Sequence, residues 1–441
     1  MKKIIKPKER EIIIQSLRSG VVPRLGIQHI QVGRIEELKS VLKDIDMITT
    51  NSSSFRIIIG EYGSGKTFFL SLARIIALEK GLVTVNADLS LSKRLYGRTG
   101  YVTALISDLI SSMSTRSKPD GKALPMILDR LISVARERAL SGKKDASIAF
   151  RESIQEIRDI HGGFSFFSVI MKYYEACETG NEVLKDNCLK WLRAEYKTKK
   201  DAAQDLGIME YLDDTSLFST LRVYAILVKK AGYNGLLICL DEMAVLYKLN
   251  GKSRNNNYEE ILYIINNTIQ GNVTNMGFIM SGTPEFLTDS HRGLYSYDAL
   301  KSRLSENSFS KRLGLVDRNS VVLRLENLRK EDLYILLKNI RHVYAMGKEE
   351  NYLVPDEALI AYMNYCANRI GDSYFRTPRN TIRGFLDLLS ILEQYPLLKW
   401  SDVIDEIDIQ EDIESSDVDE ILSSQSKLSE DEEDEFATFK L

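Results

Sequence analysis

The chain has 441 residues, of which 44% are hydrophobic and 27% are charged, and this composition suits two or three globular domains of roughly 100–200 residues each. No apolar run approaches the ~20 residues that cross a bilayer, and the first residues lack the apolar stretch and cleavage site of a signal peptide, so we expect a cytoplasmic protein with no membrane partner. The net charge of −3 conceals an asymmetry, because residues 401–441 include 16 acidic and 2 basic side chains whereas residues 1–400 include 46 acidic and 57 basic ones.

The first predicted elements form a helical flank over residues 1–50, with helices over 9–18 and 35–48. Phe55–Ile59 is a short β-branched run, typical of a buried parallel strand. A helix over about 65–80 and a strand over Leu82–Ala87 follow it. This order of strand, helix and strand indicates a parallel sheet.

Helical patterns then continue from about residue 95 to 230, which predicts a large helical insertion between strands of the sheet. Three more strands are expected at Gly235–Leu240, Gly277–Met280 and, at an edge, Val321–Leu325. We therefore predict an α/β fold with a parallel-sheet core over residues 51–325. A small all-α lid over residues 326–400 and an acidic tail over 401–441, at least partly disordered, complete the chain.

The strongest motif lies between the first strand and its helix, where Gly60–Thr67 matches G-x-x-x-x-G-K-[ST], the phosphate-binding loop known as Walker A. Glycines let backbone N–H groups approach phosphates, and the following helix directs its positive end at the anion. We expect Lys66 to reach the β- and γ-phosphates of ATP and the Thr67 hydroxyl to bind Mg²⁺. The residues expected to bind the nucleotide here are Gly60, Glu61, Tyr62, Gly63, Ser64, Gly65, Lys66, Thr67 and Phe68.

A second motif ends the strand at Gly235–Leu240, where Asp241 and Glu242 follow an apolar run in the Walker B pattern. Parallel strands end at the same edge of a sheet, so Asp241 should emerge beside the phosphate loop and bind Mg²⁺. Glu242 is placed to deprotonate the attacking water. An Asp-Glu pair favours activation of water over activation of a substrate hydroxyl, so we expect an ATPase rather than a small-molecule kinase.

Four further residues are candidates for three catalytic roles. Thr283, just after the strand at Gly277–Met280, is the first choice for a hydroxyl that senses the γ-phosphate, and Ser281 is the alternative. Arg303 and Arg379 are candidates for neutralising charge on the transferred phosphoryl group.

Several short segments together support a family resemblance that extends from residue 17 to about 390. The segments are Leu17-Arg-Ser-Gly-Val-Val-Pro-Arg24, Val32-Gly33-Arg34, Gly60–Thr67, Ala87-Asp88-Leu89-Ser90, Leu240-Asp-Glu242, Ser281-Gly-Thr-Pro-Glu285 and Thr377-Pro-Arg379. With them the chain resembles AAA+ ATPases of the origin-recognition and ExeA-like branch. More narrowly, it resembles the ATP-binding proteins of BREX-type bacterial phage-defence systems.

This resemblance implies an AAA+-like P-loop fold that uses ATP and Mg²⁺. It also implies that Gly33 and Arg34 lie near the adenine, that Arg379 is a second sensor, and that Arg303 acts in trans on a neighbouring subunit. The chain would then form a homo-oligomer or a complex with other defence proteins. No winged-helix pattern follows the lid, so sequence-specific DNA binding is not expected.

Two functions remain open at this stage. The first is a DNA-associated motor or switch in a defence complex, and the second is a STAND-like signalling or scaffold ATPase that acts on protein partners only. Non-sequence-specific DNA binding is suggested by a basic segment, which the acidic tail could compete for. Its nine cations are Arg292, Lys301, Arg303, Lys311, Arg312, Arg318, Arg324, Arg329 and Lys330.

Overall fold

The computed structural model describes residues 4–97, 100–143, 145–214, 217–307, 309, 312–313, 315, 317–376, 378–407 and 409. The chain divides into two compact units. The first comprises Met1–Val32, Tyr62–Ser64 and Asn327–Leu441, and the second comprises Gly33–Glu61 and Gly65–Glu326. Lys311, Thr377 and the acidic tail beyond residue 409 lie outside the described residues, so the expectations about them stay predictions.

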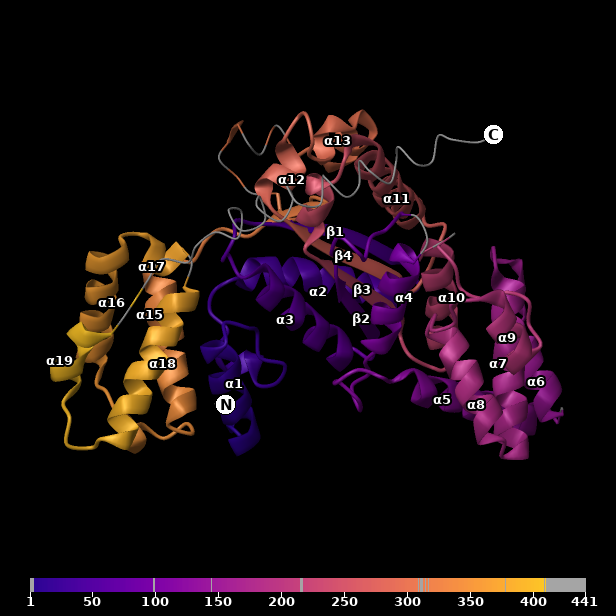
Figure 1. Ribbon diagram of the computed structural model, residues 1–441, viewed down its shortest axis with the longest axis horizontal. Helices are drawn as coiled ribbons and strands as arrows, with labels where there is room; N and C mark the ends of the chain where they lie inside the picture. The colour runs from indigo at the N-terminus through magenta and orange to yellow at the C-terminus, as the bar shows by residue number, and fades with distance from the viewer. Residues whose placement is uncertain are drawn as a thin grey trace, which may run out of the picture. The chain divides into compact units, whose positions relative to one another are not determined.

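A five-stranded parallel sheet forms the centre of the second unit, with the strand order β2-β3-β4-β1-β5 (Figure 1). The strands are β1 (Ser53–Ile59), β2 (Val83–Asp88), β3 (Leu236–Asp241), β4 (Met276–Gly282) and β5 (Val322–Arg324). Each predicted strand is present, and β5 lies at an edge as expected. Because β4 lies between β1 and β3, three carboxyl ends meet side by side: those of the strand before the phosphate loop, the strand of Ser281 and the strand of Asp241.

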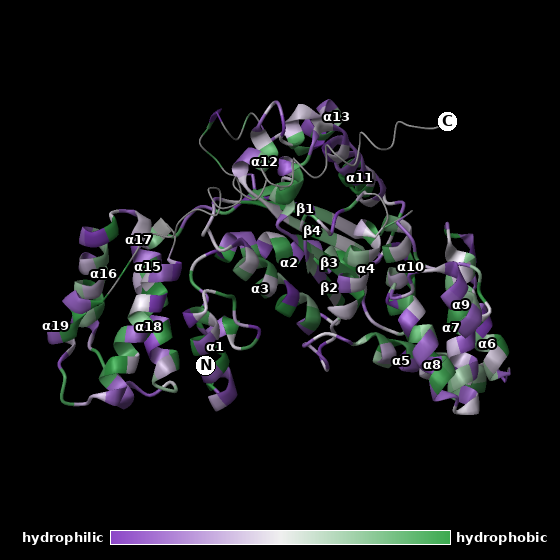
Figure 2. Ribbon diagram, viewed as in Figure 1, coloured by the Kyte–Doolittle hydropathy of each residue, from purple (hydrophilic) through white to green (hydrophobic). Residues whose placement is uncertain are grey.

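Helices cover both faces of this sheet. On one face, Ile58, Leu237 and Ile279 pack against α2 (Ile35–Thr49) and α3 (Lys66–Glu79). On the other face, alternate residues of the same strands, among them Ile57, Ile238 and Phe278, pack into a larger core with the insertion helices. Figure 2 shows the strands as mainly hydrophobic, as expected for a sheet that is buried on both sides. The predicted α/β fold is confirmed.

The helical insertion leaves the sheet after β2 and returns to β3. Its helices are α4 (Tyr101–Ser111), α5 (Leu124–Gly142), α6 (Ala146–Ser153), η2 (Gln155–Asp159), α7 (Gly163–Thr179), α8 (Glu182–Leu192), α9 (Lys199–Leu206) and α10 (Leu217–Lys230). The ring of Phe166 is nearly perpendicular to the rings of buried Trp191 and Tyr224, whose centres lie 5.0 and 5.7 Å from its own. This aromatic cluster continues the core that begins at the sheet. The second unit also contains η3 (Met243–Lys248), α11 (Gly251–Ile269), α12 (Pro284–Thr288), η4 (Leu294–Ser296) and α13 (Asp298–Leu304).

The first unit is helical and combines the two ends of the described chain. Its N-terminal elements are α1 (Pro7–Arg18) and η1 (Ile27–His29), and the others are α15 (Lys330–Tyr344), η5 (Glu349–Asn351), α16 (Asp356–Ile370), α17 (Ser373–Arg376), α18 (Arg379–Gln394), α19 (Trp400–Val403) and η6 (Ile404–Glu406). Nowhere in the described part of the chain is a helix long and apolar enough to cross a membrane.

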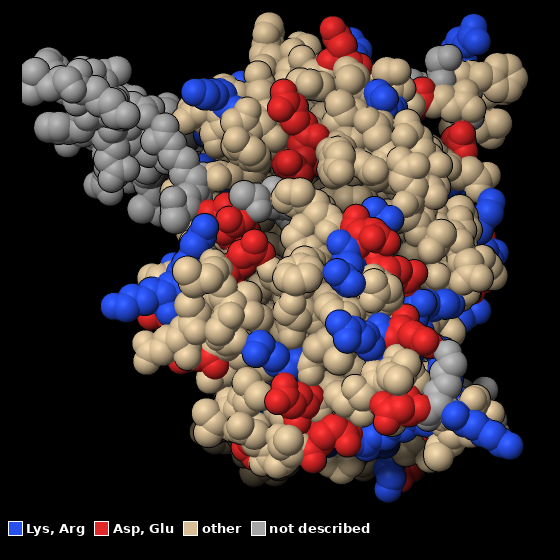
Figure 3. All heavy atoms as spheres, turned by 90° about the vertical axis from the view of Figure 1, so that its right-hand side faces the viewer, with Lys and Arg blue, Asp and Glu red and all other residues tan. Residues whose placement is uncertain are grey.

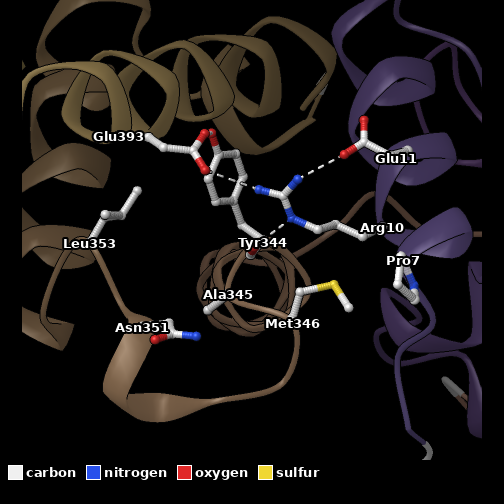
Figure 4. Close-up of a pocket in the computed structure, with 9 residues that line it drawn as sticks. All are labelled: Pro7, Arg10, Glu11, Tyr344, Ala345, Met346, Asn351, Leu353 and Glu393. Carbon is white, nitrogen blue, oxygen red and sulfur yellow. Dashed lines mark hydrogen bonds and ion pairs between the residues drawn. The ribbon is translucent and has the colours of Figure 1, made fainter.

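Arg10 fastens α1 to two of these helices beside an open cavity of about 590 Å³ (Figure 4). Its Nε donates to the Tyr344 carbonyl at 2.7 Å, and its guanidinium lies 4.6 Å from the centre of the Tyr344 ring. The Nη2 of Arg10 also lies 3.4 Å from a carboxylate oxygen of Glu393 on α18, and the Tyr344 hydroxyl donates to the same carboxylate. Helix α1 is therefore an integral part of the first unit.

A buried ion pair ties β1 to α2 in the second unit. Arg56 and Asp44 are only 5% and 7% exposed. The Nε and Nη2 of Arg56 donate to the two carboxylate oxygens of Asp44, and its Nη1 donates to the Ser320 carbonyl at 2.7 Å. One guanidinium thus satisfies a buried carboxylate and the backbone just before β5.

We expect Arg56→Met to destabilise the second unit by about 3–5 kcal/mol, because it leaves the Asp44 carboxylate buried and unpaired. The double variant Asp44→Leu/Arg56→Met should recover most of this loss. Urea unfolding followed by the fluorescence of buried Trp191 measures both. Lys39→Met, which breaks an exposed pair with Glu36 on the same helix, is the control and should change stability little. A double variant as unstable as Arg56→Met would contradict the prediction.

Candidate functional site

The phosphate loop connects β1 to α3 and depends on its glycines. Gly60 N–H donates to the Gly282 carbonyl at 3.2 Å, which ties the start of the loop to β4. Gly63 and Gly65 have φ angles of +78° and +85°. Side chains disfavour this left-handed conformation, so the path of the loop requires glycine at both positions, although the space around Gly65 is open.

The Lys66 ammonium lies against the phosphate loop. Its Nζ donates to the carbonyls of Gly60 at 2.8 Å and Glu61 at 2.9 Å. Burial lowers the pKa of Lys66, while nearby Glu242 and Asp241 favour its charged form. A cation held by two neutral carbonyls can exchange these contacts for phosphate oxygens, which bind it more strongly.

The Asp241 carboxylate joins three elements at the edge of the sheet. It accepts hydrogen bonds from the Thr67 hydroxyl of α3 at 2.7 Å, from the Ser281 hydroxyl of β4, and from the Glu242 N–H at 2.9 Å. Asp241 and Thr67 thus present adjacent hard oxygen atoms, which suit Mg²⁺. The described residues include no cluster of three acidic, histidine or cysteine side chains that could hold a metal. A cation at Asp241 and Thr67 would therefore complete its shell with water or phosphate oxygens.

Glu242 follows Asp241 and has a φ of +57°, which is uncommon for a residue with a side chain and turns the chain directly into η3. Burial, and then the charge of Asp241, raises the pKa of Glu242, although Lys66 opposes this shift. A carboxylate with a raised pKa is a stronger base than an exposed one.

Asp88 is a residue of this site to which sequence reasoning assigned no role. It ends β2 and is paired in register with Asp241 at the end of β3. Burial, and then the charge of Asp241, raises the pKa of Asp88. Its place at the end of a predicted parallel strand is the signal that could have identified it.

The two hydroxyl candidates for the sensor have different surroundings. Ser281 is fully buried, and its hydroxyl donates to Asp241. Thr283, the first choice, lies beyond the end of β4, where its hydroxyl accepts the N–H of Phe286 at 3.4 Å and caps α12. The structure therefore brings Ser281 to the Walker B carboxylate, and the role expected of Thr283 stays a prediction.

The expected trans-acting arginine, Arg303, is bound within its own unit. Its Nε donates to the Asn266 side chain at 2.6 Å and its Nη1 to the Ala299 carbonyl at 2.8 Å. It is exposed on α13. These contacts hold the guanidinium on the surface formed by α11 and α13, and its role in a neighbouring site stays a prediction.

Arg379 begins α18 in the first unit and contacts two of the motif segments. Its Nη1 donates to the Tyr62 hydroxyl at 3.1 Å, and its guanidinium lies 5.7 Å from the centre of that ring. A Cβ added to Gly20, whose φ is +68°, would lie 2.9 Å from the Arg379 Cδ. Gly20 is therefore needed both for its backbone conformation and for the close approach of the Arg379 side chain.

Gly33 and Arg34, expected near the adenine, precede α2 and both have a φ of +61°. The Arg34 guanidinium donates to the Glu326 carbonyl. Two consecutive left-handed residues turn the chain sharply into α2, and the contact with a nucleotide base stays a prediction. Phe68, in the first turn of α3, is partly buried.

Comparison with protein families identifies a match over most of the chain. Residues 5–408 match the model of a family described as BREX system ATP-binding protein BrxC/D. The match covers nearly the whole chain and confirms the predicted resemblance to the ATP-binding proteins of BREX systems. No curated protein matches the chain.

Replacing each hydroxyl separately would distinguish the two sensor candidates. We expect Ser281→Ala to lower ATP turnover by about tenfold or more, because a hydrogen bond to a charged group contributes about 1.5–3 kcal/mol. Thr283→Ala should cost about 1 kcal/mol of stability through the lost cap and leave turnover within about twofold. Steady-state ATPase rates and thermal unfolding measure these effects. The reverse pattern would make Thr283 the sensor.

Proposed function

Because the chain belongs to the BREX system ATP-binding protein BrxC/D family, we propose that it is a P-loop ATPase that hydrolyses ATP with Mg²⁺ at the site around Asp241. The observation that supports this most is the meeting of Lys66, Thr67 and Glu242 around one buried carboxylate. These groups are the ones needed to bind a polyphosphate, hold a cation and deprotonate water.

Nucleotide binding is assigned to the phosphate loop. Its N–H groups and the start of α3 bind phosphate oxygens, and the Lys66 ammonium moves from loop carbonyls to the β- and γ-phosphates. Thr67 and Asp241 would hold Mg²⁺, which neutralises charge on the phosphates. Their hydroxyl and carboxylate are already 2.7 Å apart, so the ligand pair is in place before the cation binds.

Hydrolysis is assigned to Glu242 as general base. Its carboxylate accepts a proton from water while the water oxygen forms a bond to the γ-phosphorus and the bond to the ADP oxygen breaks. Because burial raises the pKa of Glu242 above its ordinary range, turnover should fall as pH is lowered through this raised pKa. Ser281 holds Asp241 in place, and Asp88 adds negative charge that keeps Glu242 basic.

The two arginines complete an AAA+-type arrangement in this proposal. Arg379 acts as a second sensor, supported by its contact with Tyr62 in the phosphate loop. Arg303 acts on the site of a neighbouring subunit, which requires a homo-oligomer or a complex with related chains. Its exposure on α13 supports this assignment.

For the cellular role, we propose a DNA-associated motor or switch in a BREX defence complex. The basic segment at 291–330 gives this little support. Arg329 and Lys330 fall in the first unit and the other described cations in the second, where Arg324 pairs with Glu306 and Arg292 lies over the Tyr247 ring. On the side of the molecule shown in Figure 3, basic and acidic side chains are interspersed.

The STAND-like alternative, in which the protein acts only on protein partners, is favoured by the surface of the helical insertion. Large apolar side chains are exposed on its helices and loops, where they are available to contact a protein partner. They are Leu140, Ile148, Phe164, Val183 and Met209, each at least 54% exposed.

Two substitutions separate binding from hydrolysis. We expect Lys66→Ala to abolish ATP binding, because Lys66 contacts the ground-state phosphates. Glu242→Gln should keep ATP affinity and lower turnover by about 100-fold or more, because a general base contributes roughly 10²–10⁴-fold. Calorimetry and phosphate release measure the two effects, with Glu195→Gln on the exposed surface as the control. A Glu242→Gln protein that turns over ATP at the wild-type rate would contradict the assignment of Glu242 as general base.

Mixing inactive subunits tests the trans role of Arg303. Arg303→Ala and Lys66→Ala should each be inactive alone, but randomly assembled equal mixtures in a ring should regain activity at about one quarter of the interfaces. Asn266→Ala, which removes one of the two contacts of the guanidinium and keeps the arginine, is the control and should stay active. No recovery at any ratio, in a protein shown to oligomerise, would exclude the trans role.

A further inference from the structure

A second cavity of about 420 Å³ lies in the second unit, away from the site around Asp241. It is lined by the residues just before β4 and by Met276, the first residue of that strand, together with side chains of α5, η2 and α10. Ser281, which contacts Asp241, lies near the other end of β4. A strand rises about 3.3 Å per residue, so Met276 and Ser281 are roughly 16 Å apart along this strand.

The side chains that line this cavity are strongly basic. Four cations, Arg138, Arg222, Lys229 and Lys230, face it together with a single carboxylate, Glu156. Lys230 pairs with Glu156 at 2.9 Å. Within the described residues, none of the other three cations forms an ion pair. The four cations and the one carboxylate give the lining of the cavity a formal net charge of +3.

The arrangement differs from an ordinary solvated helix face. Arg222 and Lys229 lie two turns apart on α10, with Ala225 and Ile226 between them, and Arg138 reaches the same hollow from α5. Like charges converging on one cavity repel each other and destabilise the fold. Among the described residues that line the cavity, Glu156 is the one carboxylate, and it is already paired with Lys230. The cavity is therefore electrostatically suited to an anion.

We propose that this cavity binds a phosphate-bearing ligand. An arginine guanidinium group can bind a phosphate through two parallel hydrogen bonds. Arg138 and Arg222 supply two such groups from different helices. Exposed Asn272 and Thr274 on the loop before β4 add neutral polar groups at the rim. The volume lies in the range of small-molecule sites, and the phosphate belongs either to a free phosphorylated molecule or to a nucleic-acid backbone.

The test uses the full chain with Lys66→Ala, so that the phosphate loop does not bind the probes. Arg138, Arg222 and Lys229 are replaced by glutamine, and binding is measured with inorganic pyrophosphate by calorimetry and with a 20-base-pair duplex DNA by fluorescence anisotropy. The charge-matched control replaces Lys197, Lys199 and Lys200, which are exposed near α9, by glutamine. Arg222→Gln alone, at an exposed position, is the second variant if the triple variant unfolds.

The proposal predicts that the cavity variant loses at least tenfold in affinity for one of the probes while the control does not. Loss for pyrophosphate identifies a free phosphorylated ligand. Loss for DNA identifies a nucleic-acid backbone. In that case the slope of log K against the logarithm of the salt concentration should also become shallower by about 2–3, because each lost phosphate contact removes about 0.9 from it. Equal affinities of the cavity variant and the control for both probes would overturn the proposal. The proposal would also be overturned if polyglutamate displaced a probe as effectively as the unlabelled probe does, because the cavity would then respond only to charge.

Discussion

The buried carboxylate of Asp241 is the group around which the candidate site is arranged. A carboxylate in this position is costly unless hydrogen bonds satisfy it, and its donors come from α3, from β4 and from its own strand end. They meet only if β3 and β4 keep their register and α3 packs against the sheet. The apolar alternation that fixes the fold therefore also fixes the geometry around Asp241.

Desolvation changes the chemistry of the groups around this carboxylate in a consistent way. It lowers the pKa of Lys66 and raises those of Glu242 and Asp88. Each group is held where its charged form is less favourable than in water. A ligand that brings opposite charge relieves this cost, which is how a preorganised site converts burial into binding and catalysis.

The sequence predicts what depends on local pattern. The five strands and the phosphate loop follow from short apolar runs and glycine spacing. The choice between Ser281 and Thr283 could not be made in this way, because β4 continues to Gly282, two residues past the apolar run that identified it. Asp88 ends a predicted strand, but only the strand order places it beside Asp241. The contact between Arg10 and Tyr344 joins residues 334 positions apart, a separation that no periodic pattern spans.

That last contact has a consequence for how the protein folds. Helix α1 is synthesised before its partners on α15 and α18, which follow only after the entire sheet and its insertion. Contacts between such distant segments close slowly, because the entropy of a long loop must be lost first. The apolar face of α1, including buried Ile13 and Ile14, therefore stays without its final partners during most of synthesis. In a nascent chain stalled before residue 330, the apolar face of this helix would be exposed to aggregation and to proteases.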